Sequence, residues 1–324
     1  MSADASKTSG KTWFYHAYSI WLFTRSDLKT IVFPQSIFGV ITALALYSEL
    51  DGVLPWGRVL SRIPGVLFWV WINLLPFAID NQRQPAAILE DSHNKPWRPM
   101  PSGRMTEAQA KVVMLGFYPL AICASLQLGG LKQCLTLIVL GYGYNDLNLA
   151  DWHWASRNAI NALGFCSFAS GALDVVLSES SYHISPDMYW WLLIIAAVVF
   201  STVQTQDMAD QIGDRLRGRD SFPIAVGDGA ARWLTAVPVA AWSFFCPFFW
   251  KISNGPNILI AVIGTAVSCR LLVYRGVEAD KRTFRLWNAW MAGLYVLPLW
   301  AAAGPRTLHG GNYDALKVAL GIWS

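Results

Sequence analysis

The sequence predicts an all-α, polytopic membrane protein with about nine transmembrane helices packed in one bundle. Composition supports this fold class, because 54% of the 324 residues are hydrophobic and only 14% are charged, whereas soluble domains carry about 25% charged residues. The apolar stretches support it as well, since many approach the length of about 20 residues that a helix needs to cross hydrocarbon. These features exclude a disordered chain and a disulfide scaffold.

The predicted spans follow one another along the chain, separated by short polar connections. They cover roughly residues 31–48, 63–79, 112–129, 133–145, 158–177, 188–206, 233–250, 252–269 and 286–303. The longest polar connections have about 30 residues, which leaves no room for a separate soluble domain. We therefore expect one transmembrane domain over 31–324.

The segment before the first span combines aromatic and basic residues over 13–29. This mixture is typical of an amphipathic helix that lies along the membrane interface. The alternative is a plain cytosolic tail. We assign residues 1–30 to a cytosolic tail and an interfacial helix that precede the membrane domain.

Positive charge is distributed unevenly over the connections. With an odd number of spans, 19 of the 25 Lys and Arg residues lie on the side of the N-terminus, and cytosolic loops are enriched in these residues. We expect the N-terminus and the polar connections after the second and sixth spans to be cytosolic, at the endoplasmic reticulum if the source is eukaryotic. Because topology explains the basic residues, the net charge of +4 indicates no nucleic-acid partner. Membrane lipid is an expected partner, and no obligate protein partner is evident.

An acidic cluster follows the sixth predicted span. On a continuing helix, Asp207, Asp210 and Asp214 lie three and four residues apart, so their carboxylates share one face. Like charges on one face repel unless a cation lies between them, and Mg²⁺ prefers carboxylate oxygens. The alternative is a solvated helix end whose charge is balanced by the next basic residues in the chain: Arg215, Arg217 and Arg219.

A second polar cluster follows the second predicted span, on the same side of the membrane. It supplies three candidate oxygen ligands for Mg²⁺: Asn81, Glu90 and Asp91. It then supplies three candidate phosphate-binding side chains: Lys95, Arg98 and Arg104. Guanidinium and ammonium groups bind phosphate oxygens, so the two clusters together describe a site for a diphosphate attached to a hydrocarbon tail.

Both clusters resemble motifs of the UbiA-type prenyltransferase superfamily. Residues 94–104 (NKPWRPMPSGR), preceded by Asp91, resemble the first motif of that superfamily. The acidic cluster and the residues immediately after it resemble the second motif: Asp207, Asp210 and Asp214, then Gly218-Arg219 and Phe222-Pro223. The resemblance implies a bundle around a central prenyl-diphosphate cavity, Mg²⁺ as cofactor, and Asp91, Asp210 and Asp214 as catalytic residues.

The first motif departs from the family pattern. Counting back from Asp91, the positions of the expected Asn and two acids hold Arg83, Gln84 and Ala87. We therefore choose Asn81 and Glu90 as substitute ligands. The altered motif is similar to that of the fungal members of the superfamily that act as membrane-bound terpene cyclases.

These observations lead to one principal function and two alternatives. The principal one is Mg²⁺-dependent ionisation of a prenyl diphosphate, expected to be farnesyl diphosphate, followed by intramolecular cyclisation to a terpene. Arg157, in a segment on the same side as both motifs, and Arg215, directly after the acidic cluster, are further candidates for binding the diphosphate. Aromatic rings are expected to shield the cation. The alternatives are transfer of the prenyl group to an aromatic or other small acceptor, and a non-enzymatic lipid transporter.

Overall fold

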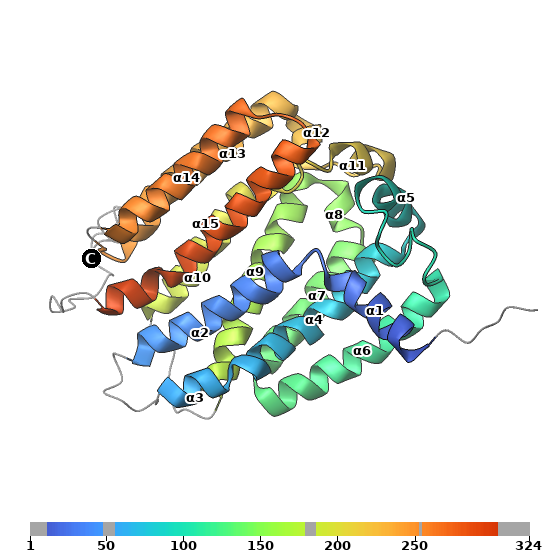
Figure 1. The fold of residues 1–324 in the computed structure, drawn as a ribbon, viewed down its shortest axis with the longest axis horizontal. Helices are drawn as coiled ribbons and strands as arrows, with labels where there is room; N and C mark the ends of the chain where they lie inside the picture. The colour runs from blue at the N-terminus through green and yellow to red at the C-terminus, as the bar shows by residue number, and fades with distance from the viewer. Residues whose placement is uncertain (1–11, 48–55, 179–185, 253–254, 304–324) are drawn as a thin grey trace, which may run out of the picture.

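The computed structural model describes residues 12–47, 56–178, 186–252 and 255–303, and the regular secondary structure of these residues is entirely helical. Nine of the described helices have 15 residues or more and form one bundle (Figure 1). They are α2 (Phe33–Tyr47), α4 (Ile63–Arg83), α6 (Glu107–Leu128), α7 (Leu131–Asn145), α9 (Trp154–Leu177), α10 (Pro186–Thr202), α13 (Asp228–Phe249), α14 (Gly255–Val273) and α15 (Val277–Ala303). Each coincides with one predicted span, which confirms the all-α fold class.

Within the described ranges, six helical stretches are long and apolar enough to cross a membrane. They are Leu28–Leu46, Trp56–Arg83, Glu107–Leu128, Trp154–Leu177, Pro186–Thr205 and Gly255–Val273. The first includes the π-helix η1 (Leu28–Val32) and the second includes α3 (Trp56–Ser61). Of the other long helices, α7 has only 15 residues, fewer than the about 20 that span hydrocarbon.

Small residues allow the central helices to approach closely. A Cβ added at Gly39 in α2 would lie 2.6 Å from the backbone of Ala172 in α9, and one at Gly171 would lie 2.0 Å from the Trp69 ring of α4. Small residues at such crossings let helix backbones touch, which is how helices associate in membranes. The core formed by α2, α4 and α9 is therefore tight, and it supports the cavity beside it.

Short helices form a polar cap at one end of the bundle (Figure 1). They are α5 (Pro85–Asn94), α8 (Leu149–Trp152), α11 (Gln211–Arg217) and α12 (Phe222–Val226). Helices α5 and α11, which carry much of the two polar motifs, lie side by side. Gly213 allows this contact, because a Cβ there would lie 2.2 Å from the Asn94 amide nitrogen.

The expectation that Asp207, Asp210 and Asp214 share one continuous helix is wrong. Helix α10 ends at Thr202, a short 3₁₀-helix η2 (Val203–Thr205) comes next, and α11 begins only at Gln211. Asp207 forms an ion pair with Arg157 of α9, whereas Asp210 contacts Lys95 beside α5. The unwound backbone lets the two carboxylates face different partners, which one helical face does not allow.

The predicted interfacial helix is present, but it is shorter than expected. Helix α1 (Trp13–Thr24) packs against α4, buries Leu22 and Phe23, and exposes Trp13 and Phe14. Its position along a membrane interface stays a prediction.

Candidate active site

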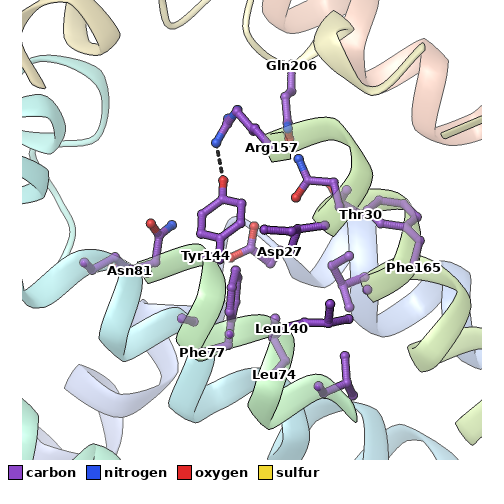
Figure 2. Close-up of a pocket in the computed structure, with 18 of the residues that line it drawn as sticks. Asp27, Thr30, Leu74, Phe77, Asn81, Leu140, Tyr144, Arg157, Phe165 and Gln206 are labelled. Carbon is purple, nitrogen blue, oxygen red and sulfur yellow. Dashed lines mark hydrogen bonds between the residues drawn. The ribbon is translucent and has the colours of Figure 1, made fainter. Parts of the chain in front are cut away.

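A cavity lies beneath the cap, between α4, α7 and α9 (Figure 2). It contains about 1100 Å³ of empty space, part of it open to solvent. Its inner part is lined by apolar side chains: Ile31, Leu74, Phe77, Ala78, Leu137, Leu140, Ile160, Phe165 and Phe168. Its mouth is lined by polar and charged ones: Asp27, Asn81, Gln82, Glu90, Lys95, Arg98, Arg157, Gln206, Asp210 and Arg219. The cavity therefore suits a molecule with an ionic head and a hydrocarbon tail.

Arg157 connects the cavity to the second acidic motif. It extends from the first turn of α9, and its Nη2 donates a hydrogen bond of 2.7 Å to Oδ1 of Asp207. Its Nη1 donates to the hydroxyl of Tyr144 at the end of α7, a contact drawn in Figure 2. Both partners are buried, so the guanidinium is held in one orientation at the cavity mouth.

Arg98 is positioned in the same way by the first motif. Its Nη1 donates to both oxygens of Asp91, at 2.8 and 2.9 Å, and its Nη2 donates to Oγ of Ser26 at 3.0 Å. Burial alone would lower the pKa of Arg98, but Asp91 and Asp27 outweigh it and raise the pKa above its usual value. Asp91 is almost fully buried, so in the structure it orients Arg98.

The cavity arginines keep buried nitrogen atoms without a partner. Among the described residues, three guanidinium nitrogens are buried without a hydrogen bond: Nε of Arg98, Nε of Arg157 and Nη2 of Arg219. All three arginines line the cavity. A buried donor without an acceptor is costly, and the cost is larger for a charged group. An anionic ligand at the mouth would satisfy these donors.

The second acidic motif also keeps buried oxygens without a partner. Oδ2 of Asp207 and Oδ2 of Asp214 form no hydrogen bond, and neither does Oδ1 of Asn81 in the first motif. Burial and the neighbouring Asp207 carboxylate raise the pKa of Asp214 to about 7, against the opposing effect of Arg157. Within the described ranges, no three His, Cys, Asp or Glu side chains converge into a metal site by themselves.

Glu90, predicted as a metal ligand, forms ion pairs with the cap in the structure. Its carboxylate lies 3.0 Å from Nη1 of Arg217 and 3.5 Å from Nη1 of Arg219. Both arginines also pair with Asp151 of α8. Burial alone would raise the pKa of Glu90, but Arg219, Arg217 and Lys95 together hold it at about 2. Glu90 therefore joins α5 to the end of α11 and to the segment after it.

Two of the predicted phosphate-binding residues lie away from the cavity. Arg104 donates hydrogen bonds to Oγ of Ser19 and the carbonyl of Tyr15, and its guanidinium lies 4.0 Å from the centre of the Tyr15 ring. It thus fastens α1 to the loop after α5. Arg215 is exposed on α11. Neither residue lines the cavity, because the folded loop and helix direct the two side chains outward.

Several cavity residues were missed by the sequence analysis. Phe77 lies one helical turn before Asn81 on α4, so helical spacing would have found it. Arg219 was expected as a balancing charge and as part of the second motif, but not as a binding residue, although it lines the cavity and pairs with Asp214 at 3.4 Å. Asp27 carries no motif or spacing signal, since only the fold brings the segment before α2 to the cavity.

Comparison with known proteins identifies the family. A model of the UbiA prenyltransferase family matches residues 40–297. The chain belongs to this family. It is accordingly a UbiA-family enzyme, as the resemblance of its two motifs suggested.

Curated relatives include several terpene synthases. Somaliensene A/B synthase of Streptomyces somaliensis is 26% identical over 313 residues, which cover 92% of this chain and 99% of the relative. Fumagillin β-trans-bergamotene synthase of Aspergillus fumigatus is 27% identical over 285 residues, which cover 87% of this chain and 91% of the relative. A polyprenyl transferase of Hericium erinaceus is 24% identical over 279 residues, which cover 82% of this chain and 88% of the relative.

Solved UbiA structures share the fold of this enzyme. A UbiA homologue from Archaeoglobus fulgidus, bound to DMAPP and Mg²⁺, superposes with a TM-score of 0.55 at 13% identity and covers 88% of this chain. A digeranylgeranylglyceryl phosphate synthase structure gives 0.54 at 17% identity and covers 87%. The enzyme is therefore a multi-pass integral membrane protein with the UbiA fold.

Proposed function

We propose that this UbiA enzyme is a Mg²⁺-dependent terpene cyclase that ionises farnesyl diphosphate and closes the resulting cation on its own double bonds. The observation that carries the proposal is the set of unpartnered guanidinium nitrogens of Arg98, Arg157 and Arg219 at the mouth of an apolar cavity. A diphosphate supplies the acceptors for these donors, and the cavity beneath accommodates its hydrocarbon tail.

Positively charged side chains at the cavity mouth form a binding site for the diphosphate. Lys95 lies 3.4 Å from Oδ2 of Asp210, so its ammonium stays at the mouth beside the three arginines. Charge placed where the leaving group gains charge lowers the barrier to ionisation. The arginines are held by buried carboxylates, so little reorganisation is needed when the C1–O bond breaks.

The acidic side chains suit a Mg²⁺ ion bound together with the diphosphate. Mg²⁺ typically binds one or two carboxylates and completes its octahedron with substrate phosphates and water. Four residues would hold the Mg²⁺ ion. Asp207, Asp214 and Asn81 each have a buried oxygen without a partner, and Asp210 lines the cavity mouth. When bound, Mg²⁺ would supply Lewis-acid stabilisation of the leaving diphosphate. Asp91 would contribute by orienting Arg98.

The inner cavity suits a carbocation. The rings of Phe77, Tyr144, Phe165 and Phe168 line it, with Phe77 and Tyr144 packed edge to face at 5.3 Å. Their π faces attract a cation, and their apolar surface excludes water. The C1–O bond breaks and the diphosphate takes the electron pair. A distal double bond then attacks C1, and loss of a proton gives a cyclic alkene.

Two lines of support favour cyclisation over transfer to an acceptor. The altered first motif is similar to that of membrane-bound terpene cyclases, and two relatives that match most of this chain are terpene synthases. The transferase alternative is supported by the polyprenyl transferase relative. Orientation belongs to the same proposal: the charge distribution favours a cytosolic cavity mouth, where a soluble diphosphate can enter.

An acceptor-free assay tests the proposal. Membranes containing the full chain are incubated with Mg²⁺ and prenyl diphosphates of ten, fifteen or twenty carbons, and the extract is examined for hydrocarbons and released diphosphate. We expect a cyclic product from the fifteen-carbon substrate and none in excess EDTA. If only linear prenyl alcohol forms, and a quinone precursor or phenolic acid is prenylated on addition, the enzyme is a transferase. Full activity in EDTA would exclude the proposed metal dependence.

A further inference from the structure

The segment between α1 and η1 contributes a carboxylate to the cavity. Asp27 lines the cavity mouth together with Lys95, Arg98 and Asp210, and Figure 2 shows it among the residues that line the cavity. Neither sequence motif includes this residue. No cation lies within ion-pair distance of its carboxylate among the described residues, although the positively charged Arg98 and Lys95 line the same cavity.

The backbone of Asp27 is fixed, while its side chain remains uncommitted. Its carbonyl accepts hydrogen bonds from the amides of Thr30, Ile31 and Val32, at 3.3, 2.7 and 3.2 Å. It occupies the N-cap of η1, a position where an aspartate side chain usually accepts a backbone N–H. Here the side chain makes no capping hydrogen bond and lines the cavity. A π-helical turn of this kind is often found at functional sites.

The first motif lacks the oxygens that a metal site needs on its side of the cavity. Gln84 and Ala87 stand at the expected acid positions. Both oxygens of Asp91 accept from Arg98, and Glu90 pairs with Arg217 and Arg219. The buried oxygens on this side that line the cavity and have no partner are then the amide oxygens of Asn81 and Gln82. Two neutral amides are a weak counterpart to the carboxylates of the second motif.

We infer that Asp27 is the carboxylate ligand for the divalent cation on the first-motif side of the cavity. The inference rests on the proposed function and adds a ligand from outside both motifs. Lys95 connects the two sides, since it contacts Asp210 directly and lines the same cavity as Asp27. Asp27 and Asp210 therefore line the same positively charged part of the cavity mouth, where a diphosphate and its metal would bind.

Direct measurement of metal binding tests the role of Asp27. The purified full chain in detergent is titrated with Mn²⁺ in the presence of farnesyl S-thiolodiphosphate, an unreactive analogue, and free Mn²⁺ is followed by electron paramagnetic resonance. Asp27→Asn is expected to raise the Kd for Mn²⁺ by at least about tenfold. Asp27→Glu, which keeps the carboxylate, should recover part of the affinity. Glu278→Gln is the control, because Glu278 is an exposed α15 residue paired with Lys281, and it should bind as the wild type does.

The outcomes separate this inference from the proposed function. Wild-type Mn²⁺ affinity in a folded Asp27→Asn variant, checked by its melting temperature, would overturn the role of Asp27 whatever its turnover. Absence of turnover by the wild type with every prenyl diphosphate would overturn the proposed function, while the Mn²⁺ titration would still decide on Asp27. No Mn²⁺ binding by the wild type with the analogue would overturn both.

Discussion

The arginines at the cavity mouth are each bound to a carboxylate on one side and unpartnered on the other. Arg157 donates to Asp207, and Arg98 donates to Asp91, yet Nε of each is buried without an acceptor. A guanidinium has several donors in one rigid plane, so it can be oriented by one anion while binding another. This property distinguishes the cavity arginines from Arg232, which is paired with Asp280 and Asp228 away from the cavity.

Arg157→Lys tests whether this geometry is needed for turnover. Lysine keeps the charge but lacks the planar arrangement of donors, so it cannot contact Asp207, Tyr144 and the diphosphate together. We expect kcat to fall by about a hundredfold, measured from product formation by purified enzyme of unchanged melting temperature. Arg215→Lys is the matched control, and it should behave as the wild type because Arg215 is exposed on α11. Equal losses of kcat in both variants would show that turnover does not depend on the position of Arg157 at the cavity mouth.

Helix α9 forms one wall of the cavity along much of its length. Arg157, Ile160, Asn161, Gly164, Phe165 and Phe168 all line the cavity, and their spacing of three and four residues places them on one face. The face begins with a cation at the mouth and ends with aromatic rings. At a rise of about 1.5 Å per residue, it extends about 16 Å from Arg157 to Phe168. Helix α9 therefore bounds the space available to the prenyl chain.

Gly164→Leu tests α9 as the boundary for chain length. A Cβ at Gly164 meets no atom within 4 Å, so a leucine side chain would enter the cavity space that an extended chain occupies. We expect kcat/KM for the fifteen-carbon diphosphate to fall at least about tenfold, while the ten-carbon diphosphate keeps its rate of ionisation. Gly116→Leu on α6, also in open space but outside the cavity lining, is the control. A uniform loss for both substrates would show that Gly164 does not limit chain length.

At the scale of the whole molecule, the bundle and the cap have separate roles. The long helices enclose the apolar part of the cavity. The cap closes its polar end through ion pairs that join α5 and α8 to the end of α11 and the segment after it. Buried pairs of this kind are costly to break, since removing one partner leaves the other charge unpaired. In the proposed function, the cap would keep the charged head group of the substrate at the membrane boundary and its hydrocarbon within the bundle.

The orientation of the whole molecule is testable with reporters at its two ends. Nine spans with a cytosolic N-terminus predict that reporters fused to the two ends lie on opposite sides of the membrane. In intact microsomes, a fluorescent protein fused to the N-terminus should be digested by added protease, whereas one fused to the C-terminus should be protected. Digestion of both reporters would mean an even number of spans. Protection of the N-terminal reporter alone would place the cavity mouth on the non-cytosolic side.

The sequence alone was sufficient to predict the all-α bundle, the positions of its long helices and the two motifs at one end. These properties depend on local composition: apolar runs of about 20 residues must become helices in a membrane, where backbone groups have no water to bind. The motifs were recognisable because each is a contiguous run. Lys95, Arg98 and Asp210 lie at the cavity mouth as expected from their motifs.

Only the tertiary structure decided which side chains face the cavity and which pair with one another. Glu90 and Asp91 are adjacent in sequence, yet Glu90 pairs with arginines of the second motif and Asp91 with Arg98. Arg104 faces α1, Arg215 is exposed, and Asp27 reaches the cavity from a segment without any motif. The physical reason is that ion pairing depends on distances of about 3 to 4 Å between residues far apart in the chain. Those distances are set by how the helices cross and where α10 unwinds.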